Sequence, residues 1–489
     1  MRRILIGFLS AMILQAAVAQ VKKSVSSQPV KSVGRQISIT LTPLKNCKVY
    51  LGSYYGKGRA LVDSTLLNEK SVGVFKGDKK LVGGIYFVVT PQMTIQFEVL
   101  MPDQQQFSIV ADTANKEQVN IIGSLDNDLF KTYSVVSNEK GRKIQGLEQS
   151  YRAATTKEDS TRYRDEIIKA DKDLQTYREG LVKQYPKSLL AMLFNTMKRP
   201  TAPPVPVVKG VPDSTYPYRY VKNHFWDNVN FNDDRLLRTP FFEPKLDDFF
   251  KYYVSQDPDS IIAEVKTMML SARTGKEIYP YLLTKFTNKY ISPEFMGQDK
   301  VFLYLFENFY AKGDTSMLNA SSKKTIIERA YSLMANQLGK PAPLLELTDT
   351  LGKTASLYEL KSAFTIVAFW DPNCGHCKEE IPRLDSMYQA KWKALGVAVY
   401  SVNIYENEIP AWKKFLVEKK ISKTWIHAYQ TKEARTKEEK AGLPSYKQLY
   451  DIFKTPTVYL LDKDKRIIAK QLSLEQFDDL IAAKLKNKQ

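Results

Sequence analysis

The sequence predicts a multi-domain protein with an N-terminal all-β sandwich, a mainly α-helical middle domain and a C-terminal α/β domain. The evidence is a change of pattern along the 489 residues. Short, partly alternating apolar runs separated by turn residues give way to long helical runs, and these give way to alternating strands and helices. The length agrees, because at roughly 150 residues per domain the chain exceeds one ordinary core.

The composition is that of a folded protein. Hydrophobic residues make up 43% and charged residues 26%, which argues against a disordered or fibrous chain. Lys and Arg outnumber Asp and Glu by 72 to 53, but the excess is scattered and forms no basic patch with interleaved aromatic residues. We therefore expect no nucleic-acid partner.

The N-terminus has the pattern of a secretory signal peptide. Arg2 and Arg3 precede an apolar stretch over residues 4–14, and Ala17-Val18-Ala19 offers small side chains for cleavage before Gln20. We expect a signal peptide at 1–19, a flexible lead-in at 20–34 and no later membrane span, hence an exported protein of the cell envelope, periplasmic in a cell with two membranes. An uncleaved anchor helix is the alternative.

The first two predicted domains follow from local periodicity. The β-sandwich covers 35–125, and its predicted strands are 36–41, 48–55, 84–89, 93–99 and 106–110. The helical domain covers 126–335; prolines interrupt it with a connector at 200–217, and helical periodicity resumes at 246–253, 260–272, 279–289, 300–310 and 323–338. The aromatic-dense stretch 224–231 fits a helix-bundle core better than a ligand pocket.

The C-terminal domain, 336–489, carries the chemistry. A predicted strand at 364–370 leads into Cys374 and Cys377, and a predicted helix follows over 379–393. Two thiols with this spacing at a helix start can close a disulfide, while the helix N–H groups stabilise a thiolate on the first sulfur.

Zinc is the alternative ligand for a C-x-x-C pair, and it requires about four ligands. The whole chain has three cysteines and three histidines, and none of His224, His376 and His427 completes a second pair with ligand spacing. His224 and His427 are interpreted as structural, and no metal is expected. The third cysteine, Cys47, is interpreted as a buried small hydrophobe on a strand, with a reactive or intermolecular thiol as the alternative.

From Gly339 onward the sequence resembles exported thioredoxin-fold thiol-disulfide oxidoreductases of the TlpA-like family. The resemblance rests on four features in order, namely Gly339-Lys340-Pro341-Ala342-Pro343, Phe369-Trp370 before Cys374-Gly375-His376-Cys377, Pro382, and Thr455-Pro456-Thr457. The upstream regions resemble the modules that precede thioredoxin-like domains in many exported bacterial proteins, a weaker resemblance that implies no chemistry.

The resemblance implies a thioredoxin-like fold and a role for each motif residue. Cys374 is the nucleophile and Cys377 the resolving thiol, and no cofactor is needed. Pro456 is expected to be a cis-proline facing the pair, and Thr455 and Trp370 to contact a substrate strand. The implied partners are protein thiol or disulfide substrates and an upstream redox partner.

Two further residues bear on the redox chemistry. His376 between the cysteines favours the reduced form and hence an oxidising potential on the order of −180 mV. Glu380 matches a glutamate that in some relatives lies near the buried thiol, where it would exchange the proton of Cys377; a solvated surface carboxylate is the equal alternative. Pro382 is expected to kink the helix without catalytic duty.

The sequence also departs from thioredoxin. Asn373 replaces the Trp before the first cysteine, and Ala368 stands where thioredoxin has a buried aspartate, so the groove lip and the proton relay are expected to differ. A peroxidase is a weaker alternative, because peroxiredoxins place Thr or Ser where Asp371 stands and Pro where Val367 stands. In a further alternative, residues upstream of 330 bind an envelope partner and the redox domain is regulatory.

Overall fold

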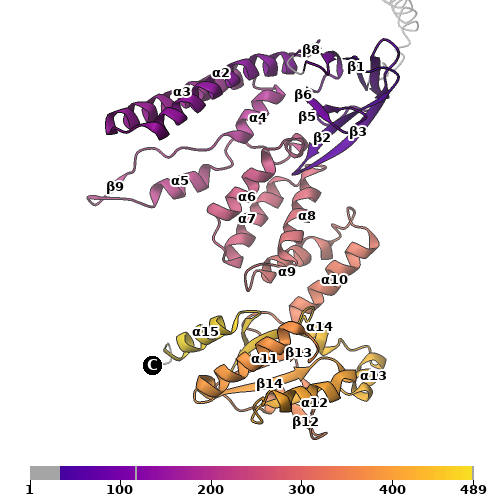
Figure 1. Cartoon of the computed structure of the whole chain (residues 1–489), viewed down its shortest axis with the longest axis vertical. Helices are drawn as coiled ribbons and strands as arrows, with labels where there is room; N and C mark the ends of the chain where they lie inside the picture. Colours follow the sequence, from indigo (N-terminus) through magenta and orange to yellow (C-terminus); the bar gives the residue numbers. More distant parts are fainter. Residues whose placement is uncertain (1–33, 116–117, 487–489) are drawn as a thin grey trace, which may run out of the picture. The chain divides into compact units, whose positions relative to one another are not determined.

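The computed structural model describes residues 34–115 and 118–486 (Figure 1). The predicted signal peptide, its cleavage site and nearly all of the lead-in lie outside the described residues. The chain forms two compact units. The first extends to Val229 and includes Asp233–Asp247, and the second comprises Asn230–Asn232 and the chain from Asp248 onward. The helices of the predicted middle domain are thus shared between the two units, and its boundaries remain a prediction.

The first unit contains the predicted β-sandwich. Two four-stranded sheets have the orders β4-β1-β7-β8 and β3-β2-β5-β6. Ile37 and Ile39 from one sheet and Val49 and Leu51 from the other share one buried core, which defines a sandwich. The strands are β1 (Arg35–Thr42), β2 (Lys48–Tyr55), β3 (Gly58–Leu66), β4 (Val72–Gly77), β5 (Gly84–Val89), β6 (Ile95–Met101), β7 (Gln106–Asp112) and β8 (Val119–Ile122).

Three of these strands, β3, β4 and β8, have no counterpart in the sequence prediction. Each lies at the edge of its sheet. An edge strand pairs on one side only, and most side chains of β3 are exposed, so its sequence lacks the alternation that marks a half-buried strand. Cys47 lies one residue before β2 and is partly buried against the sandwich core, a correction to the expectation of a fully buried strand residue.

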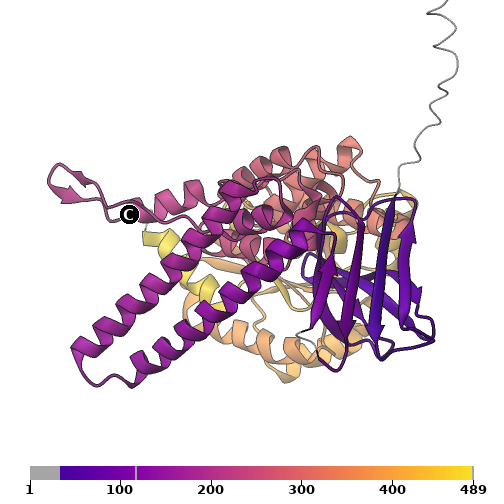
Figure 2. The same cartoon turned by 90° about the horizontal axis from the view of Figure 1, so that it is seen from above.

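The helices of the first unit begin with an antiparallel hairpin of α2 (Leu125–Ala153) and α3 (Lys157–Gln184), drawn in purple in Figure 2. The Ser124 and Thr156 side chains cap them, each accepting a backbone N–H three residues later. The remaining elements are α4 (Leu189–Met197), a short hairpin of β9 (Val207–Val208) and β10 (Val211–Pro212) inside the proline connector, α5 (Tyr216–His224) and η1 (Asp234–Arg238). Phe225, from the aromatic stretch, is buried, as expected of a core residue.

Helix α6 (Phe242–Tyr252) crosses from the first unit into the second. The helices that follow in the second unit confirm the predicted periodicity to within a few residues. They are α7 (Pro258–Ser271), α8 (Ile278–Tyr290), α9 (Asp299–Asn308), η2 (Tyr310–Lys312) and α10 (Ala320–Ala335).

The C-terminal part of the second unit is the predicted α/β fold. Its seven-stranded sheet has the order β12-β11-β15-β14-β13-β16-β17, with β13, β14 and β15 parallel and β16 and β17 antiparallel. The strands are β11 (Glu346–Asp349), β12 (Thr354–Ser356), β13 (Phe364–Trp370), β14 (Val397–Asn403), β15 (Ile426–Tyr429), β16 (Thr457–Asp462) and β17 (Ile467–Lys470). The mixed sheet of a thioredoxin-like domain is confirmed.

Helices cover both faces of this sheet. Residues of α11, α12 and α15 form one core with the sheet, and residues of α14 and of the segment entering the domain form the other. The helical elements are η3 (Leu357–Glu359), α11 (Gly375–Met387), η4 (Tyr388–Trp392), η5 (Glu406–Glu408), α12 (Ile409–Glu418), α13 (Lys432–Lys440), α14 (Tyr446–Leu449) and α15 (Leu474–Lys486). Strand β13 is buried along its whole length because it is central and covered on both sides.

A buried ion pair joins α9 to the last strand within the second unit. Lys470 Nζ on β17 donates to Asp299 Oδ2 at 2.7 Å, and the side chains are 7% and 5% exposed. The ammonium also donates to the carbonyl and the side-chain oxygen of Asn336, at 3.1 and 2.7 Å. Charged, hydrogen-bonded groups therefore connect the helices before Gly339 to the thioredoxin-like sheet.

Candidate active site

The cysteine pair lies where β13 ends and α11 begins. Cys374 is the N-cap residue of α11 and is half-buried, whereas Cys377 lies in the first turn and is fully buried. The Asp371 carboxylate accepts the Asn373 N–H at 2.8 Å, and its carbonyl accepts the Cys374 N–H at 3.2 Å, which fixes the connecting turn. The structure thus confirms the strand-to-helix placement that the sequence predicts.

A loop distant in sequence lies against Cys374. The Thr455–Pro456 peptide bond is cis, as the sequence predicts. The Cys374 thiol donates to the Thr455 carbonyl oxygen at an S···O distance of 3.5 Å. Thr455 therefore presents its backbone carbonyl next to the Cys374 sulfur.

The surroundings of Cys374 favour its thiolate. Partial burial alone would raise the pKa of this thiol. Hydrogen bonds from the Thr455 side chain, from the Cys377 backbone and thiol, and from the His376 backbone outweigh that effect and lower the pKa below its ordinary value.

Cys377 has the opposite character. Burial raises the pKa of its thiol to about 12, although the Asp371 backbone acts against the increase. At neutral pH the Cys374 thiol is therefore the more readily ionised of the two, and the Cys377 thiol stays protonated.

Glu380 lines a small cavity beside the cis-proline. The cavity has a volume of about 230 Å³. Its walls come from three segments distant in sequence, and the lining residues are Glu380, Ile381, Leu384, Lys454, Pro456, Val458, Gln471, Leu472, Ser473 and Leu474. The Glu380 carboxylate forms an ion pair with Arg383 on the same helix. Sequence reasoning missed Lys454, although it directly precedes the Thr455-Pro456 motif.

The other predicted site residues take different places. Trp370 is 0% exposed, and its indole N–H donates to Ser401 Oγ at 2.8 Å. This corrects the expectation that Trp370 contacts substrate, because its side chain lies in the core beneath the site. The His376 side chain is exposed on the first turn of α11, and Pro382 lies inside that helix.

The two remaining histidines are separate from the cysteine pair. The His224 ring nitrogen Nδ1 lies 2.8 Å from Asp227 Oδ2, and His427 Nε2 lies 3.0 Å from the Ser422 carbonyl oxygen. Burial lowers the pKa of His427. Within residues 34–115 and 118–486, no three His, Cys, Asp or Glu side chains gather as metal ligands would. In the same ranges no helix is both long and apolar enough to cross a membrane.

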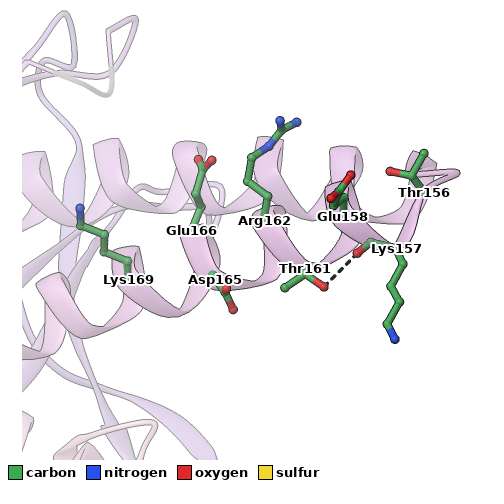
Figure 3. A pocket seen from close by; sticks show the side chains of 8 residues that line it. All are labelled: Thr156, Lys157, Glu158, Thr161, Arg162, Asp165, Glu166 and Lys169. Atoms are coloured by element: carbon green, nitrogen blue, oxygen red, sulfur yellow. Dashed lines mark hydrogen bonds between the residues drawn. The ribbon is translucent and has the colours of Figure 1, made fainter.

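Figure 3 shows a larger hollow on the helical hairpin, with a volume of about 880 Å³. All its lining residues belong to one short stretch at the start of α3, and most are charged: Thr156, Lys157, Glu158, Thr161, Arg162, Asp165, Glu166 and Lys169. The hydrogen bond drawn there, from Thr161 Oγ1 to the Lys157 carbonyl at 2.9 Å, is internal to the helix. The hollow is therefore a gap between surface side chains, and the candidate site is the cysteine pair.

Comparison with known proteins agrees with the fold. Residues 338–470 match the AhpC/TSA family, and residues 169–332 match DUF5106, a domain of unknown function. Thiol-disulfide oxidoreductase ResA from a strain of Bacillus cereus is 30% identical over 134 residues, 27% of this chain and 69% of the relative. ResA from Bacillus thuringiensis (strain Al Hakam) is 27% identical over 150 residues, 31% of this chain and 78% of the relative.

A solved structure of a thioredoxin-like protein from Bacteroides caccae ATCC 43185 is also similar. It is 23% identical, with a TM-score of 0.45, and the match covers 58% of this chain and 99% of that chain.

The C-terminal region is thus a thioredoxin-like domain with thiol-disulfide oxidoreductase relatives. From the identity and coverage shared with ResA, the chain belongs to the thiol-disulfide oxidoreductase family, and its enzymatic class is that of an oxidoreductase.

Proposed function

We propose that this protein exchanges disulfides with exported proteins through Cys374 and Cys377. The observation that carries the proposal is the contrast between the two thiols. The pKa of the half-buried Cys374 is lowered at a helix start, whereas the pKa of the buried Cys377 is raised to about 12. This pairing suits one sulfur to attack and the other to resolve.

In the reducing direction the Cys374 thiolate attacks one sulfur of a substrate disulfide. The substrate S–S bond breaks, a Cys374–substrate bond forms, and the leaving thiolate takes a proton from water. Cys377 then loses its proton and attacks Cys374 Sγ, which releases the second substrate thiolate and leaves a Cys374–Cys377 disulfide. Two electrons pass to the substrate, and an upstream redox partner restores the dithiol; the oxidising direction is the reverse.

We include Glu380 and Thr455 in this proposal. Glu380 follows Cys377 by three residues on α11 and lines the cavity beside Pro456, so its carboxylate is our candidate acceptor for the Cys377 proton. An unchanged rate of resolution in Glu380→Gln would refute that role. The Thr455 carbonyl, 3.5 Å from Cys374 Sγ, is the proposed backbone contact for a substrate strand.

The proposed setting is the cell envelope. It rests on the signal-peptide pattern of residues 1–19. Peroxidase chemistry is not proposed, although the AhpC/TSA family matches, because the position three residues before Cys374 holds Asp371 rather than Thr or Ser.

The function is tested by a redox titration of the full-length protein in glutathione buffers. Oxidation is expected to remove two hydrogens and to join Cys374 to Cys377 within one peptide, while Cys47 stays open to alkylation. If His376 acts as the resemblance implies, the midpoint falls on the order of −180 mV. A disulfide that involves Cys47 instead would refute the assignment. So would a protein whose three thiols all stay free in the oxidising buffers.

A further inference from the structure

The loop that carries Thr455 and Pro456 is held by a helix from outside the thioredoxin-like domain. We call residues 451–456 the cis-proline loop. Arg329 on α10 forms an ion pair with Asp451, the first residue of this loop, and their side chains are only 14% and 3% exposed. Arg329 Nε also donates to the Ile291 carbonyl at 2.9 Å, so its guanidinium is fixed on the helical side as well.

Two more contacts attach the same segment to α10. The Arg329 guanidinium lies 4.8 Å from the centroid of the Phe453 ring, a cation–π contact within the loop. Asn336, just after α10, donates from Nδ2 to the Leu449 carbonyl at the end of α14 at 2.9 Å. Helix α10 and the short helix α14 are thus in contact within the second unit.

The far end of the cis-proline loop bears on the reactive sulfur. Thr455 follows Asp451 by four residues, and its carbonyl oxygen lies 3.5 Å from Cys374 Sγ. At this end Thr457 Oγ1, on the first residue of β16, donates to the Lys454 carbonyl in the loop at 2.5 Å, which connects the loop to the strand. Because this segment is short and is held at both ends, a shift of Asp451 also moves Thr455.

We propose that Arg329 is a positioning residue for the redox site, and that it sets the place of Thr455 against Cys374 through Asp451. Arg329 lies inside residues 169–332, the segment that matches the domain of unknown function. The helical segment would thereby contribute to the active site rather than only precede it. The inference rests on the proposed function, because it concerns the same cysteine pair.

The test is the alkylation of Cys374 in the reduced full-length protein as a function of pH, followed on the Cys374 peptide by mass spectrometry. Iodoacetamide reacts with the thiolate, so the rate rises as pH passes upward through the pKa of Cys374 and then levels off. In Arg329→Gln the loop is released and the Thr455 hydroxyl moves away, so the midpoint should rise. A midpoint higher by about one pH unit would lower the rate at pH 7 roughly tenfold.

Asp451→Asn is the second variant, because Asp451 has a φ of 51° and Asn tolerates this left-handed backbone. It should raise the midpoint in the same way, and the double variant Arg329→Gln/Asp451→Asn should raise it no further than either single variant. Arg329→Lys, which keeps the charge, should restore part of the effect. Phe453→Leu removes the cation–π contact with Arg329, and it should fold because Phe453 is 76% exposed.

Glu328→Gln is the matched control, since its partner is the exposed Lys324 on the same helix, at 3.7 Å. It should leave the alkylation midpoint unchanged. The exposed His376 is present in every variant, so it cannot account for a difference between them. If Arg329→Gln or Asp451→Asn folds but keeps the wild-type midpoint, the proposal is overturned. Alkylation needs no substrate, so this result is independent of whether the wild-type protein exchanges disulfides.

Discussion

Replacing Cys374 by Ser is expected to lower the rate of disulfide exchange by at least about 10³-fold. A serine hydroxyl at this position would remain protonated, and oxygen cannot form the mixed disulfide on which exchange depends. Cys377 cannot take over, because it is fully buried and its pKa is raised to about 12. The measurement is the initial rate of insulin disulfide reduction by the purified full-length variant, compared with the wild type.

The matched control is Cys47→Ser. Cys47 is the third cysteine of the chain and packs partly buried against the β-sandwich core, in the other compact unit. Its loss should leave the rate of insulin reduction at the wild-type level. An active Cys374→Ser variant would contradict the nucleophile assignment, and so would an inactive Cys47→Ser variant that is still folded.

Asp299→Ala is expected to lower the free energy of unfolding of the second unit by about 3–5 kcal/mol. The substitution leaves the ammonium of Lys470 in a site where both side chains of the pair are less than a tenth exposed. Burial already lowers the pKa of Lys470, and the negative charge of Asp299 is the largest influence that raises it. The measurement is the urea midpoint of the variant, followed by circular dichroism.

Asp259→Ala provides the comparison. Asp259 forms an equally short ion pair with Lys300, at 2.6 Å, but the carboxylate is 71% exposed. Water and salt screen such a pair, so its loss should cost less than about 1 kcal/mol. Equal effects of the two substitutions would show that burial of the Lys470 pair does not matter to stability.

The parts of this fold that the sequence predicts are those with a strong local signal. Strand β13 has the predicted bounds, because seven consecutive buried residues leave a continuous apolar run. The cysteine pair at the start of α11 and the cis bond before Pro456 were also predicted, since each depends on a few neighbouring residues.

Other features depend on contacts that no local pattern records. Arg329 and Asp451 are 122 positions apart, and a single arginine on a helix is typical of a solvated surface. The edge strands β3 and β4 pair on one side only, and the short strands β11 and β12 are too brief to show a period. The motif predicted a substrate contact for Trp370, but the sheet places its side chain in the core.

The most direct test of the central claim is to trap substrates on Cys374 in living cells with the variant Cys377→Ser. Without the resolving thiol, the first step still occurs but the mixed disulfide cannot be released, so covalent complexes should accumulate. We expect them to disappear on reduction, to be absent from Cys374→Ser/Cys377→Ser, and to contain exported proteins linked through Cys374. A lack of reducible complexes, or complexes only with proteins that are not exported, would contradict disulfide exchange in the cell envelope.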